Sequence, residues 1–347
     1  MRKLAWMAVS LSVLAALAAG QASKKTLDLQ TYFKQSVGLT DDQVAQIRGG
    51  QAFAKAMPSR TPAEIIVWGA VYVKATPDSY LKFSSDYDRL AKMPGYVAIR
   101  KISTPPQPAD FKGFDADKDD IHAMKDCKPG DCDVQMPASS MEDFQKSIDW
   151  SAPDVDVRVN QLAQKKILEG VTAYQSQGNA ILGVYNDKDH PTVVPDQFKY
   201  ILSYSKVLPN YLPAFYNYLL TYPKGKPANV EDTFYWAKVS FGLKPTLRVV
   251  HVVTLRGKAP GEPAYAIAEK QLYSNHYFQT ALDVTFCISD AGDPTRPGFY
   301  MIKAMGSEQA GLTGFKGSIV RKVAVGRSAS SLEKSLAAIK GLLEQTR

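Results

Sequence analysis

The segment Leu247-Arg-Val-Val-His-Val-Val-Thr-Leu-Arg256 belongs to the part of the sequence that decides the fold. It is rich in β-branched residues, which favour a β-strand. Further runs of strand character, joined by turns and without helical patterns between them, lie at residues 233–241, 264–273, 276–288 and 299–305. Consecutive strands of this kind predict an antiparallel meander.

A helix at the end of the chain is predicted to cover this sheet. Residues 330–345 carry an apolar stripe at helical spacing, formed by Leu332, Leu336, Ile339 and Leu343. An antiparallel sheet must bury one face, so the C-terminal helix is its expected cover. The sequence therefore predicts an α+β fold in which the meander packs on this helix.

Further elements are predicted upstream of the meander. Residues 65–73 and 97–103 have strand character, and a helix lies between them. Residues 26–57 look helical, with a capping box at Thr40. From residue 141 to 222 the pattern is helical throughout.

These patterns divide the chain into five segments. They are a signal peptide (1–22), an N-terminal helical segment (23–60), the first part of an α+β domain (61–140), a large α-helical insertion (141–230), and the second part of the domain with the C-terminal helix (231–347).

The order strand, helix, strand, hairpin and then a meander closed by a C-terminal helix resembles the helix-grip layout of START-like lipid-transfer and polyketide-cyclase-like proteins. The resemblance covers residues 61–140 and 231–347. It implies an apolar cavity between the meander and the C-terminal helix, which binds a lipid or other hydrophobic small molecule.

Several segments are similar to those of a set of uncharacterised exported bacterial proteins. The matching stretches are Cys127-Lys-Pro-Gly-Asp-Cys-Asp-Val134, Asp149-Trp-Ser-Ala-Pro-Asp154, Phe234-Tyr-Trp236 with Phe241-Gly-Leu-Lys-Pro245, and Lys270-Gln-Leu-Tyr-Ser-Asn-His-Tyr-Phe278. That set has no assigned activity, so the resemblance transfers no functional residue. This resemblance implies a turn with basic and acidic residues near residues 307–312. At that place this chain has Ser307-Glu-Gln-Ala-Gly311.

The N-terminus has the pattern of a cleavable secretory signal peptide. Arg2 and Lys3 precede an apolar run that ends at Ala19, and Gly20-Gln21-Ala22 supplies small residues for cleavage. An uncleaved N-terminal anchor is the alternative. No later stretch approaches the roughly 20 apolar residues that a spanning helix needs. We therefore expect a soluble periplasmic or secreted protein without stable membrane insertion.

The cysteines agree with export. Cys127 and Cys132 flank Lys-Pro-Gly-Asp, whose Pro-Gly order favours a tight turn, and a disulfide across it is expected in an oxidising compartment. A metal site needs more Cys or His nearby, and a redox pair has the closer C-x-x-C spacing. Cys287 is expected to be a buried strand thiol. The net charge of +8 is spread along the chain, so nucleic acid is not an expected partner.

Two histidines are the main candidates for chemistry. Alternation places His251 on the same strand face as apolar residues, where it is either a satisfied core histidine or a polar group inside a cavity. His276 follows a turn and is flanked by aromatic residues, and its alternative role is packing at a strand end. If both faced one cavity with Glu269 or Asp283, a general acid and base pair would be possible. Tyr273 is a further catalytic candidate.

Aromatic residues can line an amphipathic ligand cavity, because they combine apolar rings with polar tips. The ligand-binding candidates are His251, Tyr235, Trp236, Tyr277 and Phe278. The same residues also suit ordinary packing of helices on a sheet.

The sequence contains no motif for metal binding, nucleophilic catalysis or nucleotide binding. Asp115, Asp117, Asp119 and Asp126 imitate the spacing of a calcium loop, but Asp120 replaces the glycine needed for its turn, so a solvated acidic loop is the better account. The sequence lacks the G-x-S-x-G elbow, the H-E-x-x-H helix, the P-loop and the dinucleotide fingerprint. No metal and no cofactor are expected.

Three hypotheses follow. The first is an exported protein that binds a hydrophobic small molecule or lipid. The second is an acid–base enzyme that uses His251, His276, Glu269 and Tyr273. The third is an envelope interaction module that exposes the tyrosine-rich residues 196–222, and burial of Tyr211, Phe215 and Tyr218 against the sheet would remove its motivation.

Overall fold

The predicted strands, together with one further edge strand, form an antiparallel sheet of eight strands in the order β1-β2-β10-β9-β8-β7-β6-β3. The computed structural model describes residues 28–240, 243–258, 262–289 and 297–345, so the predicted signal peptide lies outside the described residues. The strands are β1 (Phe53–Met57), β2 (Glu64–Val73), β3 (Tyr96–Ile102), β6 (Val230–Val239), β7 (Thr246–Arg256), β8 (Tyr265–Ser274), β9 (Phe278–Ser289) and β10 (Phe299–Gln309).

Strands β6 to β10 pair in sequence order, which confirms the predicted meander. Strand β2 pairs with β10 and strand β3 pairs with β6, so the two upstream strands flank the meander on opposite sides. Together with the C-terminal helix, this order gives the predicted helix-grip-like α+β fold.

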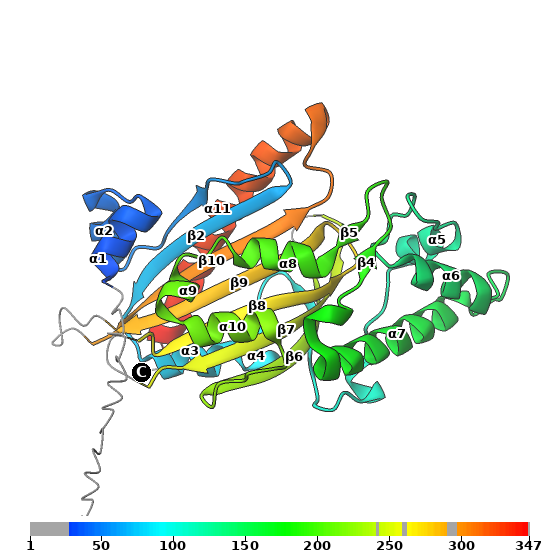
Figure 1. Cartoon of the computed structure of the whole chain (residues 1–347), viewed down its shortest axis with the longest axis horizontal. Coiled ribbons are helices and arrows are strands. Elements are labelled where there is room, and N and C mark those ends of the chain that lie inside the picture. Colours follow the sequence, from blue (N-terminus) through cyan, green and yellow to red (C-terminus); the bar gives the residue numbers. More distant parts are fainter. Residues whose placement is uncertain (1–27, 241–242, 259–261, 290–296, 346–347) are drawn as a thin grey trace, which may run out of the picture.

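One face of the sheet, called here the α11 face, is covered by α3 (Pro77–Ser84), α4 (Tyr87–Leu90) and α11 (Gly314–Glu344). These helices lie behind the sheet in Figure 1. Leu332 and Leu336 of α11 are buried, as the apolar stripe predicts. A side chain at Gly69 of β2 would come within 2.8 Å of Leu336 Cδ1, so glycine lets the helix lie close to the sheet. The helix begins at Gly314, well before the predicted start at residue 330.

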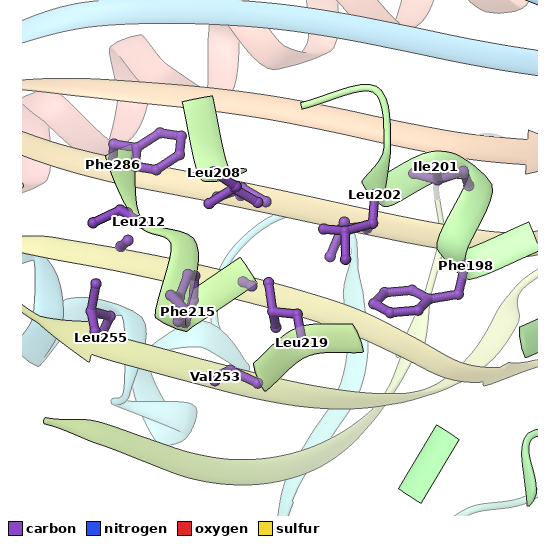
Figure 2. Packing of buried hydrophobic residues seen from close by; sticks show 14 of the residues in the cluster. Phe198, Ile201, Leu202, Leu208, Leu212, Phe215, Leu219, Val253, Leu255 and Phe286 are labelled. Atoms are coloured by element: carbon purple, nitrogen blue, oxygen red, sulfur yellow. The ribbon is translucent and has the colours of Figure 1, made fainter. Parts of the chain in front are cut away.

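The opposite face, called the α8 face, is covered by α8 (Val194–Leu202), α9 (Val207–Tyr211) and α10 (Pro213–Thr221). Figure 2 shows Phe198, Leu208 and Phe215 directed from these helices toward strand residues such as Val253 and Phe286. Phe215 and Tyr218 are buried and Tyr211 is half-buried. The interaction-module hypothesis therefore loses its motivation.

The N-terminal helices lie over the β2 end of the α8 face. They are α1 (Leu29–Thr31), the π-helix η1 (Tyr32–Val37) and α2 (Asp41–Arg48), and Phe33 packs against Trp68 and Tyr300. Residues 53–57, predicted as part of this helical region, instead form the edge strand β1. The backbone of β1 pairs with β2 from Phe53↔Ala70 to Met57↔Ile66, and this tertiary pairing overrides the local helical pattern.

The remaining helices gather at one end of the sheet, to the right in Figure 1. They are the 3₁₀ turn η2 (Pro108–Phe111), α5 (Lys118–Lys125), α6 (Ala138–Ser147), α7 (Val155–Gln177) and the 3₁₀ turn η3 (Gly178–Ile181), beside a short pair of strands, β4 (Val184–Tyr185) and β5 (Thr192–Val193). The predicted disulfide between Cys127 and Cys132 is present and buried within this group. No helix in the described part of the chain is long and apolar enough to cross a membrane.

Candidate functional site

The pairing of the strands places the predicted site residues on different faces. His251 is opposite Lys270, while Glu269 is opposite Val252. Successive residues of a strand point to opposite faces, so His251 lies on the α8 face and Glu269 on the α11 face. Of the other candidates, Trp236 and Tyr273 are both opposite Val249 and lie on the α8 face, whereas Tyr235 is opposite Val250 on the α11 face.

His251 is almost fully buried between aromatic rings. It stacks on Phe234 with ring centroids 4.5 Å apart and lies 4.4 Å from the ring of Tyr222. Its Nε2 is 2.9 Å from Asp232 Oδ1 and its Nδ1 is 3.0 Å from the hydroxyl oxygen of Tyr174. Asp232, on the adjacent strand β6, also accepts hydrogen bonds from Tyr218 and Lys226, each at 2.7 Å.

These partners fix the protonation of His251. Because Asp232 only accepts, Nε2 carries the proton and Nδ1 accepts the hydrogen bond of Tyr174. Burial lowers the pKa of His251 to about 4, against the opposing effect of Asp232. Burial alone would raise the pKa of Asp232, but the hydrogen bonds from His251, Lys226 and Tyr218 lower it. The imidazole is therefore neutral beside an ionised carboxylate.

Lys270 extends this network into the core. Its Nζ lies 3.2 Å from the Tyr174 hydroxyl oxygen, donates to Asn179 Oδ1 and lies 3.9 Å from the centre of the Phe198 ring. Burial lowers the pKa of Lys270 well below its usual value. The hydrogen bonds run in one direction, from Lys270 through Tyr174 and His251 to Asp232, and they join α7 and η3 to the sheet.

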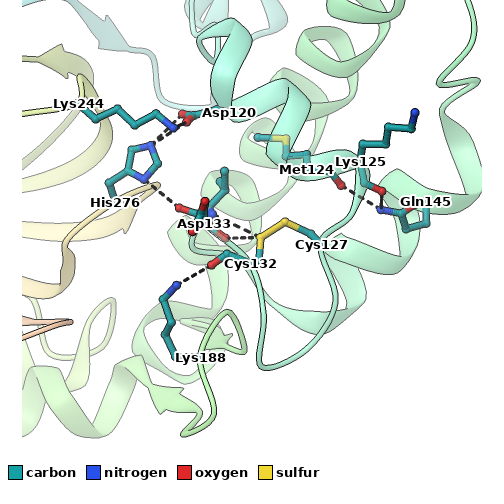
Figure 3. The surroundings of a disulfide bond; sticks show 11 residues. Asp120, Met124, Lys125, Cys127, Cys132, Asp133, Gln145, Lys188, Lys244 and His276 are labelled. Carbon is teal, nitrogen blue, oxygen red and sulfur yellow. Dashed lines mark hydrogen bonds and ion pairs between the residues drawn. A yellow bond between two sulfur atoms is a disulfide. The ribbon is translucent and has the colours of Figure 1, made fainter.

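His276 belongs to a separate network at the β8–β9 turn (Figure 3). Its Nε2 lies 2.9 Å from Asp120 Oδ2, and its Nδ1 lies 3.1 Å from the carbonyl oxygen of Asp133. Lys244 forms an ion pair with the same Asp120, which is buried. The expected solvated acidic loop is therefore wrong for Asp120. Burial would raise the pKa of Asp120, but the hydrogen bonds from His276 and Lys244 lower it.

The two histidines have no hydrogen-bonding partner in common among the described residues. Glu269 faces away from His251 through the sheet. The structure therefore does not assemble the single acid–base pocket that the enzyme hypothesis requires, because strand alternation and the position of His276 in a turn separate these groups.

Glu269 forms a third cluster, on the α11 face. Its carboxylate accepts a hydrogen bond of 3.1 Å from Tyr235 and lies 3.4 Å from Lys303 Nζ, which is also 3.4 Å from Asp283. Burial raises the pKa of Asp283, whereas Lys303 lowers the pKa of Glu269 against the effect of burial. This carboxylate pair is therefore held together by one lysine.

The other aromatic candidates have structural partners. Trp236 Nε1 donates to the carbonyl oxygen of Asp110 at 2.7 Å, and the Tyr277 hydroxyl accepts from the backbone N–H of Lys244 at 3.2 Å. The guanidinium of Arg248 lies 5.5 Å from the centre of the Phe278 ring.

A mainly apolar cavity of about 260 Å³ opens at the end of the α8 face, between the strands and helices α6 and α7. Its walls include aromatic and aliphatic side chains from several elements: Phe144, Ile167, Tyr174, Tyr185, Val249 and Tyr273. Ser140 and Lys166 add polar groups, and Gly170 lines it while being exposed, which places it at the opening. We call this space the apolar cavity.

A second cavity of about 260 Å³ lies on the α11 face, beneath α3 and α4. Most of the residues that line it carry a charged or hydroxyl group, among them Asp78, Glu231, Thr233, Arg256 and Glu269. The sequence predicts an apolar cavity between the meander and the C-terminal helix, and the apolar cavity described above is not at that place. The apolar cavity lies on the opposite face, because the helical insertion supplies most of its wall.

Within the residues that the structure describes, no three His, Cys, Asp or Glu side chains come together as metal ligands. Sequence reasoning missed Tyr174, Lys270 and Asp232, whose proximity to His251 depends on strand register and on a distant helix. Tyr174 lies within the region from residue 141 to 222, for which the sequence predicts only a helical pattern.

Comparison with known proteins yields structural neighbours alone. Neither a protein-family model nor a curated protein matches the sequence. A START superfamily protein from Mycobacterium smegmatis is similar at 14% identity over 44% of this chain and 92% of its own, with a TM-score of 0.24. The di-domain ARO/CYC StfQ of the steffimycin biosynthetic pathway aligns at 14% identity over 56% of this chain and 62% of its own, with a TM-score of 0.23.

A third neighbour is Ara h 8.0201, with 11% identity over 43% of this chain and 90% of its own and a TM-score of 0.17. The first two neighbours belong to the START and cyclase groups that the sequence resembles. At these TM-scores the similarity transfers no site residue.

Proposed function

We propose that this protein binds a compact hydrophobic small molecule in the apolar cavity. The observation that carries the proposal is the cavity itself, which combines apolar walls with an open end. Small-molecule sites are concave and mostly apolar, with a few polar groups that orient the ligand. Its volume of about 260 Å³ lies just below the range of roughly 300–1,000 Å³ for such sites, which favours one acyl chain or a compact ring system over a two-chain lipid.

The polar groups suggest where the ligand is oriented. Lys166 lines the cavity and is paired with Asp143, and Ser140 lies on the neighbouring helix α6. The phenol of Tyr174, held by His251 and Lys270, belongs to a lining residue about two turns farther along α7 than Lys166. An apolar molecule with one polar end satisfies both parts of this lining.

We further infer that the protein acts outside the cytoplasm. The N-terminal pattern of charged, apolar and small residues supports export, and the disulfide between Cys127 and Cys132 is of the kind that oxidising compartments permit.

Native mass spectrometry of protein purified from its own host tests both parts. We expect the mass of a chain that begins after Ala22, together with an extractable bound compound. Saturable binding of the neutral fluorescent probe N-phenyl-1-naphthylamine is expected in protein stripped of that compound.

A cavity-filling variant gives the matched comparison. A Cβ at Gly170 meets no atom within 4 Å, so Gly170→Leu fills the opening without a clash and is expected to weaken probe binding at least tenfold. Gly341→Leu, in α11 and equally free of contacts, is the control and should bind normally. Ligand-free protein that never binds the probe, or equal binding by both variants, would refute the proposal.

A further inference from the structure

The N-terminal half of α11 carries apolar side chains on the side turned away from the protein. Phe315 is 85% exposed, Ile319 60% and Val323 51%. At 100° per residue these three follow one another at about 40° intervals around the helix, so they form one stripe. Val320, 54% exposed, lies beside it. In the C-terminal half of the same helix, by contrast, the apolar stripe is buried on the sheet.

The outward direction of this stripe is fixed by contacts on the other side of the helix. A Cβ at Gly317 would come within 2.6 Å of the Leu312 backbone, so this side is tightly packed. Arg321 donates to the carbonyl oxygen of Pro62 at 2.9 Å and also to Ser59. Figure 1 shows this orange half of α11 extending past the strands, where no other element covers it.

Positive charge surrounds the stripe. Lys316, Lys322 and Arg327 are exposed, and none of them takes part in an ion pair within the described residues. No acidic residue occurs between Glu308 and Glu333. An isolated apolar residue on a surface needs no explanation, but an exposed apolar stripe whose charged neighbours along the helix are all cations does.

We propose that this part of α11, residues 314–327, docks on an anionic lipid surface. Exposed apolar side chains bordered by lysine and arginine are the features of a helix that lies in the membrane interface, where rings and aliphatic groups enter the headgroup region and cations contact lipid phosphates. A second copy of the chain fits poorly, because a symmetric contact would bring the same positive charges together.

Sedimentation with vesicles tests the docking directly. We expect the full chain to bind vesicles of phosphatidylcholine with 30% phosphatidylglycerol at low salt, and to bind pure phosphatidylcholine vesicles far more weakly. Lys316→Gln/Lys322→Gln/Arg327→Gln should weaken binding about 100-fold, since each cation near such a surface contributes roughly a fivefold factor. Phe315→Ser/Ile319→Ser/Val323→Ser should weaken it to a similar degree.

Matched changes elsewhere on the surface separate docking from general charge attraction. Val157 of α7 is 54% exposed, and Lys146 and Lys165 are exposed, so Lys146→Gln/Val157→Ser/Lys165→Gln should bind almost as the unchanged chain does. Failure of the unchanged chain to bind anionic vesicles, or equal losses in the control, would overturn the proposal. So would α11 variants that lose only self-association in analytical ultracentrifugation. Circular dichroism confirms that each variant is folded.

Discussion

His251 and His276 are both buried, and each has Nε2 2.9 Å from an aspartate, but their second nitrogens face different groups. Nδ1 of His251 meets the hydroxyl of Tyr174, which can donate. Nδ1 of His276 meets the carbonyl oxygen of Asp133, which can only accept. His251 satisfies both neighbours as a neutral ring, whereas both ring nitrogens of His276 face oxygen acceptors.

The surroundings follow the same division. His251 lies among aromatic rings on the α8 face, and its aspartate is neutralised by Lys226, a lysine that reaches solvent. His276 shares the buried Asp120 with Lys244, so an imidazole and an ammonium group converge on one carboxylate. The comparison teaches that two buried histidines can differ in what surrounds them: a hydroxyl donor and aromatic rings at His251, and a second acceptor and a shared carboxylate at His276.

Removing the central aspartate should break the two networks unequally. Asp120→Ala leaves His276 and Lys244 without their shared partner, and we expect a loss of about 3–5 kcal/mol in the free energy of unfolding. Asp232→Ala should cost less, because His251 is neutral and Lys226 is accessible to water. Urea denaturation followed by circular dichroism measures both.

The exposed Asp119, next in sequence to Asp120, is the matched control, and Asp119→Ala is expected to change stability by no more than about 0.5 kcal/mol. Equal losses for Asp120→Ala and Asp232→Ala would contradict the larger role assigned to the carboxylate that Lys244 and His276 share.

Acid should affect the neutral network first. The pKa of His251 is lowered from 6.5 to about 4 in the folded chain, so between these values only the unfolded chain binds this proton. The contribution of His251 to stability is therefore complete above pH 6.5 and is lost as the pH falls toward 4. Between pH 7 and pH 5 we expect a loss of about 2 kcal/mol, measured by urea denaturation at each pH.

His251→Phe, which keeps a ring beside Phe234, should remove most of this pH dependence. Asp120 and Asp232 do not interfere, because their lowered pKa values place their loss of stabilisation below about pH 3.8. An unchanged slope in His251→Phe would show that another group titrates in this range.

The smallest effect is expected at the Tyr174 hydroxyl. Tyr174→Phe leaves His251 Nδ1 without a donor and also removes the hydroxyl that Lys270 contacts. Lys270 still donates to Asn179, so unfolding should become easier by only about 1 kcal/mol. Tyr216→Phe, on a half-buried residue of α10, is the control and should be close to neutral. If Tyr174→Phe leaves the free energy of unfolding unchanged, water replaces the hydroxyl.

Much of the sheet was predictable, because its strands carry their own signals. The segment from Leu247 to Arg256 coincides almost completely with β7, and alternation correctly places His251 on the face of Val249 and Val253. The disulfide was predictable for the same reason, since a Pro-Gly turn between Cys127 and Cys132 is a local feature.

The partners of the site residues were not predictable, since they depend on register and on packing between distant elements. Asp232 meets His251 only because β6 pairs with β7 so that Phe234 is opposite His251. Asp120 seemed to belong to a solvated loop, because nothing near it in sequence announces the histidine 156 residues away. The early start of α11 was not predicted, because its exposed apolar residues do not follow a core-facing pattern.

The buried thiol of Cys287 has a consequence for how the chain reaches its oxidised form. Three cysteines allow three pairings, and two of them would join residues more than 150 positions apart. Closing the short loop from Cys127 to Cys132 costs the least chain entropy, so the native pair is favoured before the sheet forms. Once β9 is in place, Cys287 is fully buried and burial raises its pKa, which suppresses the reactive thiolate. The order in which the disulfide and the sheet form thus protects the chain from mispairing, and Cys287 needs no cysteine partner of its own.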